Sequence, residues 1–311
     1  MDRQITAKSW VLLLVLGLVW GSTFLIIEIA LGGVGPFWLA ASRVIFAALL
    51  MTVVWTLRGF RLFASPASGR DWLNLVFVAL SSSTFPFMLL AWGQQSVTSA
   101  FAGVTMATVI FIVLPLAHFT IPGERMRLRS TVGFVVGFAG VVLLIGGQVF
   151  TSTGAEHEFA GRLAALGTAA FYAVGSVQMR RLPTCDPIGL AAVLMIIGAV
   201  AMVPIVLLVE GPPPLPAPAI LGSLVFLGLV PTAAANFIRV YLIRTVGPTF
   251  MGLVNYIVPV VSTLLGALVL SEPLPATLLA ALTVILAGMA ISQWEALARL
   301  GRRLLSRETA S

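Results

Sequence analysis

Charged side chains are scarce in this 311-residue sequence. Asp, Glu, Lys and Arg make up 9% of the residues, whereas hydrophobic residues make up 59% and the mean hydropathy is +1.07. A soluble domain usually carries roughly 25% charged residues. The low charge therefore excludes an ordinary soluble domain and predicts an all-α membrane protein with several spans.

The residues that commonly bind metals or carry out catalysis are also few. Cys185 is the single cysteine, which excludes an intramolecular disulfide, and the two histidines, His118 and His157, lie far apart in the sequence. Because zinc sites combine several Cys, His or acidic ligands, we expect no metal and no other cofactor. The apolar runs hold no aspartate, and the sequence has no His-Glu-x-x-His pair, so we expect no catalytic residues and no enzyme.

Nucleotide-binding and nucleic-acid-binding sequences are missing as well. Lys8 is the only lysine, and no Gly-x-x-x-x-Gly-Lys loop is present, which excludes a P-loop pump within this chain. The net charge of +7 comes from arginines in short connections between apolar runs. We interpret these arginines as topology signals and expect no nucleic-acid partner.

Long apolar runs dominate the sequence. About 20 apolar residues suffice for a helix to cross a bilayer. Ten runs meet this requirement, at 10–30, 37–57, 72–93, 97–119, 130–149, 161–179, 187–209, 218–241, 248–270 and 276–297. The first run is too long for the core of a cleaved secretory signal, so we expect an uncleaved helix.

The basic residues predict how the chain is oriented in the membrane. If the N-terminus is cytoplasmic, sixteen of the eighteen basic residues fall on the cytoplasmic side. They are Arg3, Lys8, Arg58, Arg61, Arg70, Arg125, Arg127, Arg129, Arg180, Arg181, Arg239, Arg244, Arg299, Arg302, Arg303 and Arg307. This asymmetry predicts that both termini are cytoplasmic.

The two halves of the chain resemble each other. Residues 96–103 (SVTSAFAG) match residues 245–252 (TVGPTFMG) at an offset of 149. Five spans per half is an odd number, so the second copy must enter the membrane from the opposite side. We therefore expect two inverted repeats, at 10–149 and 161–297. A basic tail at 298–311 should lie on the inner surface, in contact with membrane lipid.

The centre of the first run holds an unusual aromatic residue. Trp20 lies ten residues inside the run, near mid-membrane depth, whereas the other six tryptophans lie at or near run ends. It belongs to the segment Trp20-Gly21-Ser22-Thr23-Phe24. Trp20 either packs against a neighbouring helix or lines a substrate path, and the sequence leaves both open.

Three prolines lie inside expected spans and should kink them: Pro86, Pro231 and Pro259. A proline removes one N–H donor and frees the carbonyl four residues earlier. Polar or aromatic side chains lie beside these positions and in the sixth span: Ser82, Asn236, Asn255, Tyr256 and Tyr172. In lipid they must face other helices or a wet cavity. An interhelical hydrogen bond would explain any one of these residues, but the presence of such residues in several spans favours a shared cavity.

Arg43 is the deepest cation in the sequence. It lies seven residues past Pro36, about 10 Å along a helix. It could bind a substrate carboxylate, pair with Glu28 or extend to the outer surface, and these alternatives stay open. The acidic residues Glu28, Glu124 and Glu272 lie near span ends. The sequence thus offers no mid-membrane carboxylate for a simple proton relay.

Several segments together resemble the EamA-type drug/metabolite transporter superfamily. They are Trp20-Gly21-Ser22-Thr23-Phe24, Pro36 with Arg43, Thr98-Ser99-Ala100, Gly123-Glu124-Arg125, and Pro259 thirteen residues before Glu272. Within the superfamily the chain looks most like YddG-type bacterial exporters of aromatic amino acids. The resemblance implies ten helices in the bacterial inner membrane, a central cavity that faces alternate sides, and efflux of amino acids or related metabolites.

The sequence departs from the family pattern at two places. Ile110 or Phe111, depending on the alignment, occupies the position that matches Pro259 in the first half. Ser271 stands where the family has a glycine before its second glutamate. Equivalent kinks in the two halves are therefore not implied.

These observations predict a monomeric alternating-access exporter of aromatic and other neutral amino acids. Trp20, Tyr172 and Tyr256 would form apolar walls, and polar groups would hold the amino and carboxylate groups: Thr23, Ser82, Asn236 and Asn255. An exporter of cationic drugs is one alternative, although no acidic residue lies mid-span. A membrane scaffold without transport is the other, which short loops argue against.

Overall fold

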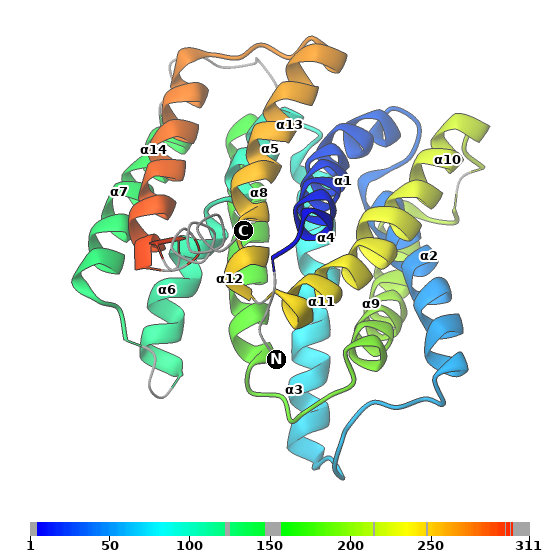
Figure 1. Cartoon of the computed structure of the whole chain (residues 1–311). Coiled ribbons are helices and arrows are strands. Elements are labelled where there is room, and N and C mark those ends of the chain that lie inside the picture. The colour runs from blue at the N-terminus through cyan, green and yellow to red at the C-terminus, as the bar shows by residue number, and fades with distance from the viewer. Residues whose placement is uncertain are drawn as a thin grey trace.

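The structure is a computed structural model that describes residues 5–121, 125–146, 157–213, 215–246, 248–295, 297–298 and 300. Within these ranges every regular element is helical (Figure 1), and the β-contact is limited to one isolated bridge between Phe63 and Cys185. The expected all-α fold is therefore confirmed for the described residues.

The helices follow the expected apolar runs. The first half contains α1 (Ala7–Leu31), α2 (Pro36–Leu57), α3 (Gly69–Ala79), the π-helical segment η1 (Leu80–Thr84), α4 (Phe85–Gly93), α5 (Ser99–Met106), α6 (Val109–Thr120) and α7 (Leu128–Gly146). The second half contains α8 (Glu158–Met179), α9 (Pro187–Glu210), α10 (Pro218–Leu227), the π-helical segment η3 (Gly228–Ala234), α11 (Ala235–Thr245), α12 (Pro248–Met251), α13 (Val254–Leu270) and α14 (Ala276–Ser292).

Seven helices in the described ranges are long and apolar enough to cross a membrane. Two of them join segments across a π-helical insertion, at Gly69–Gly93 and Pro218–Ile243. Val254–Leu270 and Ala276–Ser292 are shorter apolar helices. The count of ten spans and the position of the termini stay predictions. The predicted tail lies outside the described residues except for residues 298 and 300.

Local sequence explains where the helices begin. The Thr6 hydroxyl and the Ser9 side chain form a capping box at the start of α1, and Ser68 with Asp71 does the same for α3. Asp186 caps α9 by accepting hydrogen bonds from two backbone N–H groups at 3.0 Å. The helices α2, α9 and α10 also begin with a proline in the first turn, where no N–H is needed.

The third expected span of each half contains a π-helical segment. In η1 the N–H of Phe85 donates to the carbonyl of Leu80, five residues earlier, and Pro86 follows directly. In the second half Pro231 lies within η3 itself. A π-insertion redirects backbone bonds that a proline would leave unmade. Two of the three expected proline positions therefore lie in or next to a π-segment.

The fourth expected span of each half is divided by a turn. In the first half α5 ends at Met106, and Ala107 and Thr108 separate it from α6. In the second half α12 ends at Met251, and residues 252–253 separate it from α13. Neither turn contains a proline, so proline positions did not predict these breaks.

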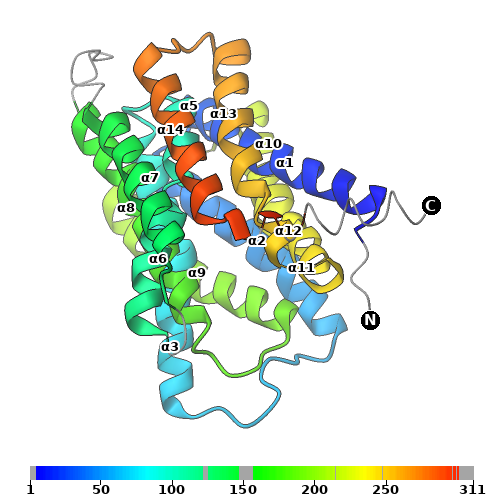
Figure 2. The same ribbon diagram turned by 60° about the vertical axis from the view of Figure 1, so that its left-hand side comes forward.

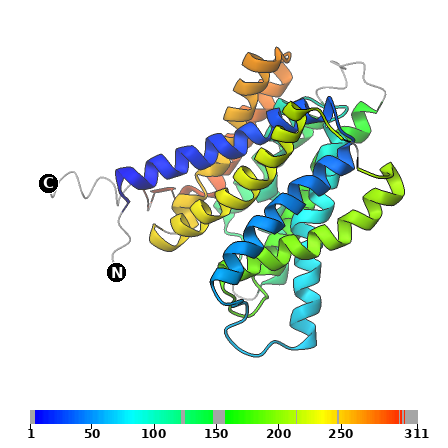
Figure 3. The same ribbon diagram turned by 90° about the vertical axis from the view of Figure 1, so that its right-hand side faces the viewer.

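Helices of the first half pack largely against helices of the second. The first helix of each half contacts the fourth of the other, as α1 does with α13 and α8 with α6. The second helices, α2 and α9, pack together, and so do the fifth, α7 and α14. Figures 1 and 2 show α7 and α14 side by side, and Figure 3 shows α1 (dark blue) running beside α10 and α11.

Candidate functional site

A cavity of about 580 Å³ lies between the two halves of the chain. Its walls come from α1, α2, η1, α4, the α5–α6 turn, α8, α9, η3, α11 and α13. Most lining residues are apolar. The polar ones include seven of the eight predicted substrate-binding residues, namely Trp20, Thr23, Arg43, Ser82, Tyr172, Asn236 and Asn255. Residues far apart in the sequence thus converge on one cavity.

Arg43 is fixed in the wall of this cavity by a residue of the other half. Its Nε donates to the Thr232 hydroxyl at 2.7 Å, and Arg43 is only 7% exposed. The Thr232 hydroxyl in turn donates to the carbonyl of Leu227 at 2.7 Å. That carbonyl lies four residues before Pro231, which has no N–H to donate to it. The bond to Leu227 orients the Thr232 hydroxyl so that it accepts a hydrogen bond from Arg43.

The guanidinium also lies over an aromatic ring. The Arg43 Cζ is 4.2 Å from the centroid of Phe87, a cation–π geometry. Among the described residues no ion pair involves Arg43. The expected alternatives for Arg43, a pair with Glu28 or extension to the outer surface, are therefore wrong. The reason is that α2 packs against η3, which turns the side chain inward to Thr232.

The two Nη atoms of Arg43 are available for a ligand. Within the described ranges the hydrogen bond of Arg43 uses Nε alone, while Arg43 itself lines the cavity. A guanidinium with a free Nη edge binds carboxylates through two parallel hydrogen bonds. This edge of Arg43 has the chemistry to pair with a carboxylate.

Trp20 both lines the cavity and holds η3. Its Nε1 donates to the carbonyl of Pro231 at 3.0 Å, and Gly17 and Gly21 on α1 face Ile257 and Val261 of α13. The two interpretations of Trp20, helix packing and cavity lining, are thus both realised. A phenylalanine at this position would keep the wall but lose the hydrogen bond to the Pro231 carbonyl.

This arrangement gives a first prediction. Trp20→Ala should lower transport more than Trp20→Phe, because alanine removes both the aromatic wall and the hydrogen bond. We expect Trp20→Phe to cost about 1 kcal/mol of stability for the lost bond. Transport rates and membrane-inserted amounts should be measured for both variants. Normal transport by Trp20→Ala would show that Trp20 is not part of the substrate-binding site.

The remaining predicted residues differ in their surroundings. Ser82 in η1 lies against α8, where a Cβ built on Gly175 would be 2.6 Å from the Ser82 Oγ. Tyr172 of α8 packs edge-on to Phe87, with ring centroids 6.4 Å apart. Asn236 donates to the Thr232 carbonyl, so one of its amide hydrogens is already committed.

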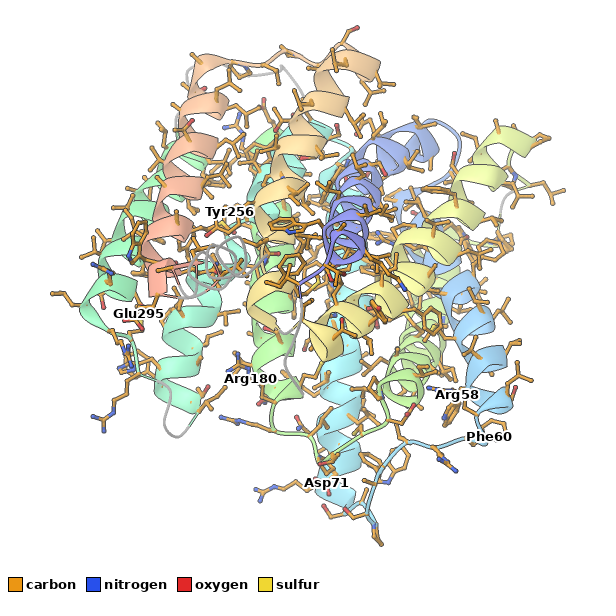
Figure 4. All side chains as sticks on the ribbon, viewed as in Figure 1. Arg58, Phe60, Asp71, Arg180, Tyr256 and Glu295 are labelled. Carbon is orange, nitrogen blue, oxygen red and sulfur yellow. The ribbon has the colours of Figure 1, made fainter. Side chains whose placement is uncertain are left out.

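Tyr256 does not line the cavity. It packs against the second hydrophobic cluster, which α5, α7 and α14 share, and its hydroxyl is buried without a partner among the described residues. Figure 4 shows Tyr256 on the side of α13 that faces α14. Its neighbour Asn255 does line the cavity, because adjacent helical residues point in different directions. We therefore omit Tyr256 from the site proposed below.

The third predicted proline lies in the cavity wall. Pro259 of α13 lines the cavity with Asn255, four residues earlier. The hydroxyls of Ser262 and Thr263 donate to the Pro259 carbonyl at 3.0 and 2.7 Å. The first-half positions that match Pro259, Ile110 and Phe111, lie in α6, whereas Gly123 and Glu124, which match the segment at Glu272, lie outside the described residues.

Sequence reasoning missed Arg239 as a cavity residue. It was counted among the cytoplasmic basic residues, but it lies within α11 and lines the cavity. The described lining thus contains two arginines, Arg43 and Arg239, and no carboxylate. By contrast, Arg58, Asp71 and Arg180 all lie in the lower part of the bundle as Figure 4 shows it.

Comparison with known proteins agrees with a helical, membrane-spanning fold. The sequence model of the EamA-like transporter family matches residues 8–146 and 159–293. The uncharacterized inner membrane transporter YedA of Escherichia coli K12 is 28% identical over 258 residues, which cover 82% of this chain and 80% of YedA. An uncharacterized transporter of Archaeoglobus fulgidus is 27% identical over 271 residues, covering 86% of this chain and 90% of the relative.

A third relative and a solved structure extend the likeness. The uncharacterized transporter YvbV of Bacillus subtilis is 24% identical over 290 residues and covers 91% of both chains. A crystal structure with 21% sequence identity superposes with a TM-score of 0.64 and covers 93% of this chain and 98% of its own. That superposition shows the fold alone. The relatives and the seven apolar helices together indicate a multi-pass inner-membrane protein.

Proposed function

Because the chain belongs to the EamA-like transporter family, we propose that it exports small metabolites that carry a carboxylate, chiefly aromatic and other neutral amino acids. The single observation that carries this proposal is the composition of the cavity wall. Arg43 presents a guanidinium whose Nη atoms are free among the described residues, and the described lining holds no acidic side chain. Charge-assisted hydrogen bonds to Arg43 would offset the cost of removing a carboxylate ligand from water.

The rest of the cavity suits an amino acid with an apolar side chain. Its volume of about 580 Å³ lies within the usual range of small-molecule sites, about 300–1,000 Å³. Trp20, Phe87 and Tyr172 supply aromatic walls, whereas Ser82 and Asn255 supply polar groups for the amino group. These features favour a zwitterion over a bulky apolar solute.

The reciprocal packing of the halves supports alternating access. The cavity lies where the halves meet, and several helix contacts, such as those of α1 with α13 and α8 with α6, have a counterpart in the other half. Two inverted repeats that share such an interface can rock about it and expose the site to either side. The π-segments η1 and η3 lie in equivalent spans and border the cavity, so they could accommodate the change in angle.

A cationic drug is less compatible with this cavity. Two arginines would repel a cation, and the described lining offers no carboxylate to offset the repulsion. We therefore rank this alternative below amino acids.

Counterflow tests the proposal. The purified chain should be reconstituted in liposomes loaded with unlabelled phenylalanine and then given labelled phenylalanine outside. We expect saturable exchange that threonine and methionine inhibit. Lysine and a quaternary ammonium compound should inhibit little. Exchange of the quaternary compound without exchange of phenylalanine would favour the drug exporter.

A further inference from the structure

Two carboxyl groups meet at one end of the bundle, outside the cavity. Glu272 follows the end of α13 and accepts hydrogen bonds from the backbone N–H groups of Ser99 and Ala100, at 2.8 and 3.0 Å. Glu28 lies in the last turn of α1 and interacts electrostatically with Glu272 and with the side chain of Gln94. α1, α5 and α13 therefore bring two acidic residues together.

The polar atoms around these carboxyls are buried and unsatisfied. Glu28 Oε2, Gln94 Oε1 and Ser99 Oγ have no hydrogen-bond partner among the described residues. Gln94 is 1% exposed, and its Nε2 donates to the Phe24 carbonyl, one turn before Glu28. Ser99 is fully buried. Its Oγ and the Oε2 of Glu272 both lie close to Gly266: a Cβ atom placed on this glycine would be 2.8 Å from the Ser99 Oγ and 2.3 Å from the Glu272 Oε2. We call Glu28, Gln94, Ser99 and Glu272 the Glu28 cluster.

The two carboxyls differ in which form their surroundings stabilise. Glu272 receives two backbone N–H groups at the N-terminus of α5, where the helix dipole also favours negative charge. Glu28 has no such donor on Oε2 and faces the negative charge of Glu272. Two ionised carboxylates repel each other in a low-dielectric region. Backbone donors bind both oxygens of Glu272, whereas Glu28 Oε2 has no donor among the described residues.

The neighbouring elements supply no described cation to Glu28. On the elements packed against α1, the charged side chains that the structure describes are Arg43 on α2, which is bonded to Thr232, and Arg239 on α11, at the cavity. Glu210 at the end of α9 accepts hydrogen bonds from the backbone N–H groups of Phe37 and Trp38, both at 2.9 Å. On α8, Glu158 and Arg162 form their own ion pair. Glu272 is thus the charged group that Glu28 meets.

We propose that Glu28 is a proton-binding site that couples transport by this chain to a proton gradient. The inference rests on the proposed transport function. Trp20 lies eight residues before Glu28 on α1, about 12 Å along the axis. Loss of the proton would place two negative charges side by side in the Glu28 cluster and push α1 away from α5 and α13. The same helix forms one wall of the cavity, so protonation and substrate access are linked through its position.

Infrared spectroscopy tests proton binding without any substrate. The purified full-length chain in lipid should show, on a change of pH around neutrality, a carbonyl band of a protonated carboxylic acid. Glu28→Gln should remove this band. Glu210→Gln is the matched control, because Glu210 also lies in the last turn of its helix but accepts hydrogen bonds from two backbone N–H groups, and it should keep the band. A band that persists in Glu28→Gln would overturn the assignment.

Transport tests the coupling. Proteoliposomes loaded with labelled phenylalanine should be diluted into acidic buffer, and gradient-driven efflux should be divided by the exchange rate of the same preparation. We expect this ratio to fall about tenfold in Glu28→Gln and to stay unchanged in Glu210→Gln. A ratio unchanged in Glu28→Gln, or efflux driven by a sodium gradient instead, would overturn the proposal.

The two experiments separate this proposal from the proposed function. A Glu28-dependent infrared band without any amino-acid exchange would support the proton site and contradict the substrate class. Phenylalanine exchange without such a band would support the substrate class and contradict the proton site.

Discussion

Replacing Arg43 with methionine should lower phenylalanine exchange by about tenfold or more, because a charge-assisted hydrogen bond to a ligand contributes roughly 1.5–3 kcal/mol. Methionine has a similar apolar length, so the wall against Phe87 is largely kept while the charge is lost. The initial rate of counterflow should be measured over a range of phenylalanine concentrations. The loss should include a higher half-saturating concentration, since the missing group is one that binds the substrate.

Two further variants distinguish a binding role from a structural one. Thr232→Val keeps the cation but removes the hydroxyl that accepts from Arg43 Nε and donates to the Leu227 carbonyl. We expect a smaller decrease in exchange than for Arg43→Met. Arg58→Met, at an exposed arginine beyond the end of α2, should leave exchange unchanged. Equal exchange rates for Arg43→Met and the wild-type chain would show that the substrate carboxylate does not bind at Arg43.

Gly288→Val should lower the free energy of unfolding by about 3 kcal/mol or prevent folding, because the added atoms would overlap backbone. A Cβ built on Gly288 lies 2.4 Å from the backbone nitrogen of Gly137, so no side-chain movement can make room. The helices α7 and α14 touch through glycine on both sides, the arrangement by which membrane helices approach closely. Thermal unfolding of the detergent-purified chain measures the effect.

Gly137 provides a contrasting case that can be rescued. Its built Cβ lies 1.9 Å from Cζ of Phe111, the tip of a side chain. Gly137→Ala should therefore destabilise alone, and Phe111→Leu should recover part of the loss, with a coupling of about 1 kcal/mol in a double-mutant cycle. Gly222→Ala, where no neighbour lies within 4 Å, should be neutral or stabilising. Strict additivity of the first two changes would contradict this packing.

The sequence predicted the helices well because lipid imposes a simple rule. A run of about 20 apolar residues predicts a membrane-spanning helix even when the helices that pack against it are unknown. The breaks at Ala107–Thr108 and at residues 252–253 follow no such rule, because no proline or charge marks them. The π-helical form of the segments next to Pro86 and around Pro231 also depends on how neighbouring helices satisfy the freed backbone groups.

The direction in which each side chain points could not be predicted from the sequence. Seven of the eight predicted residues line one cavity, and their role in substrate binding stays a prediction. Tyr256 was grouped with Asn255 because they are adjacent, but adjacent positions on a helix face different sides. The partner of Arg43, Thr232, lies 189 residues away in the sequence. Such a contact depends on the packing of α2 against η3, which a single sequence does not encode locally.

The reciprocal packing of the two halves has a consequence for synthesis on the ribosome. α7 is complete at Gly146, whereas its glycine contact on α14, Gly288, is translated 142 residues later. At about 5–20 residues per second, α7 spends roughly 7–30 s in the membrane without this partner. During that interval the early helices persist as separately inserted segments, and their final assembly must follow translation of the last span. Nascent chains truncated before α14 should therefore be inserted in the bilayer yet remain sensitive to protease.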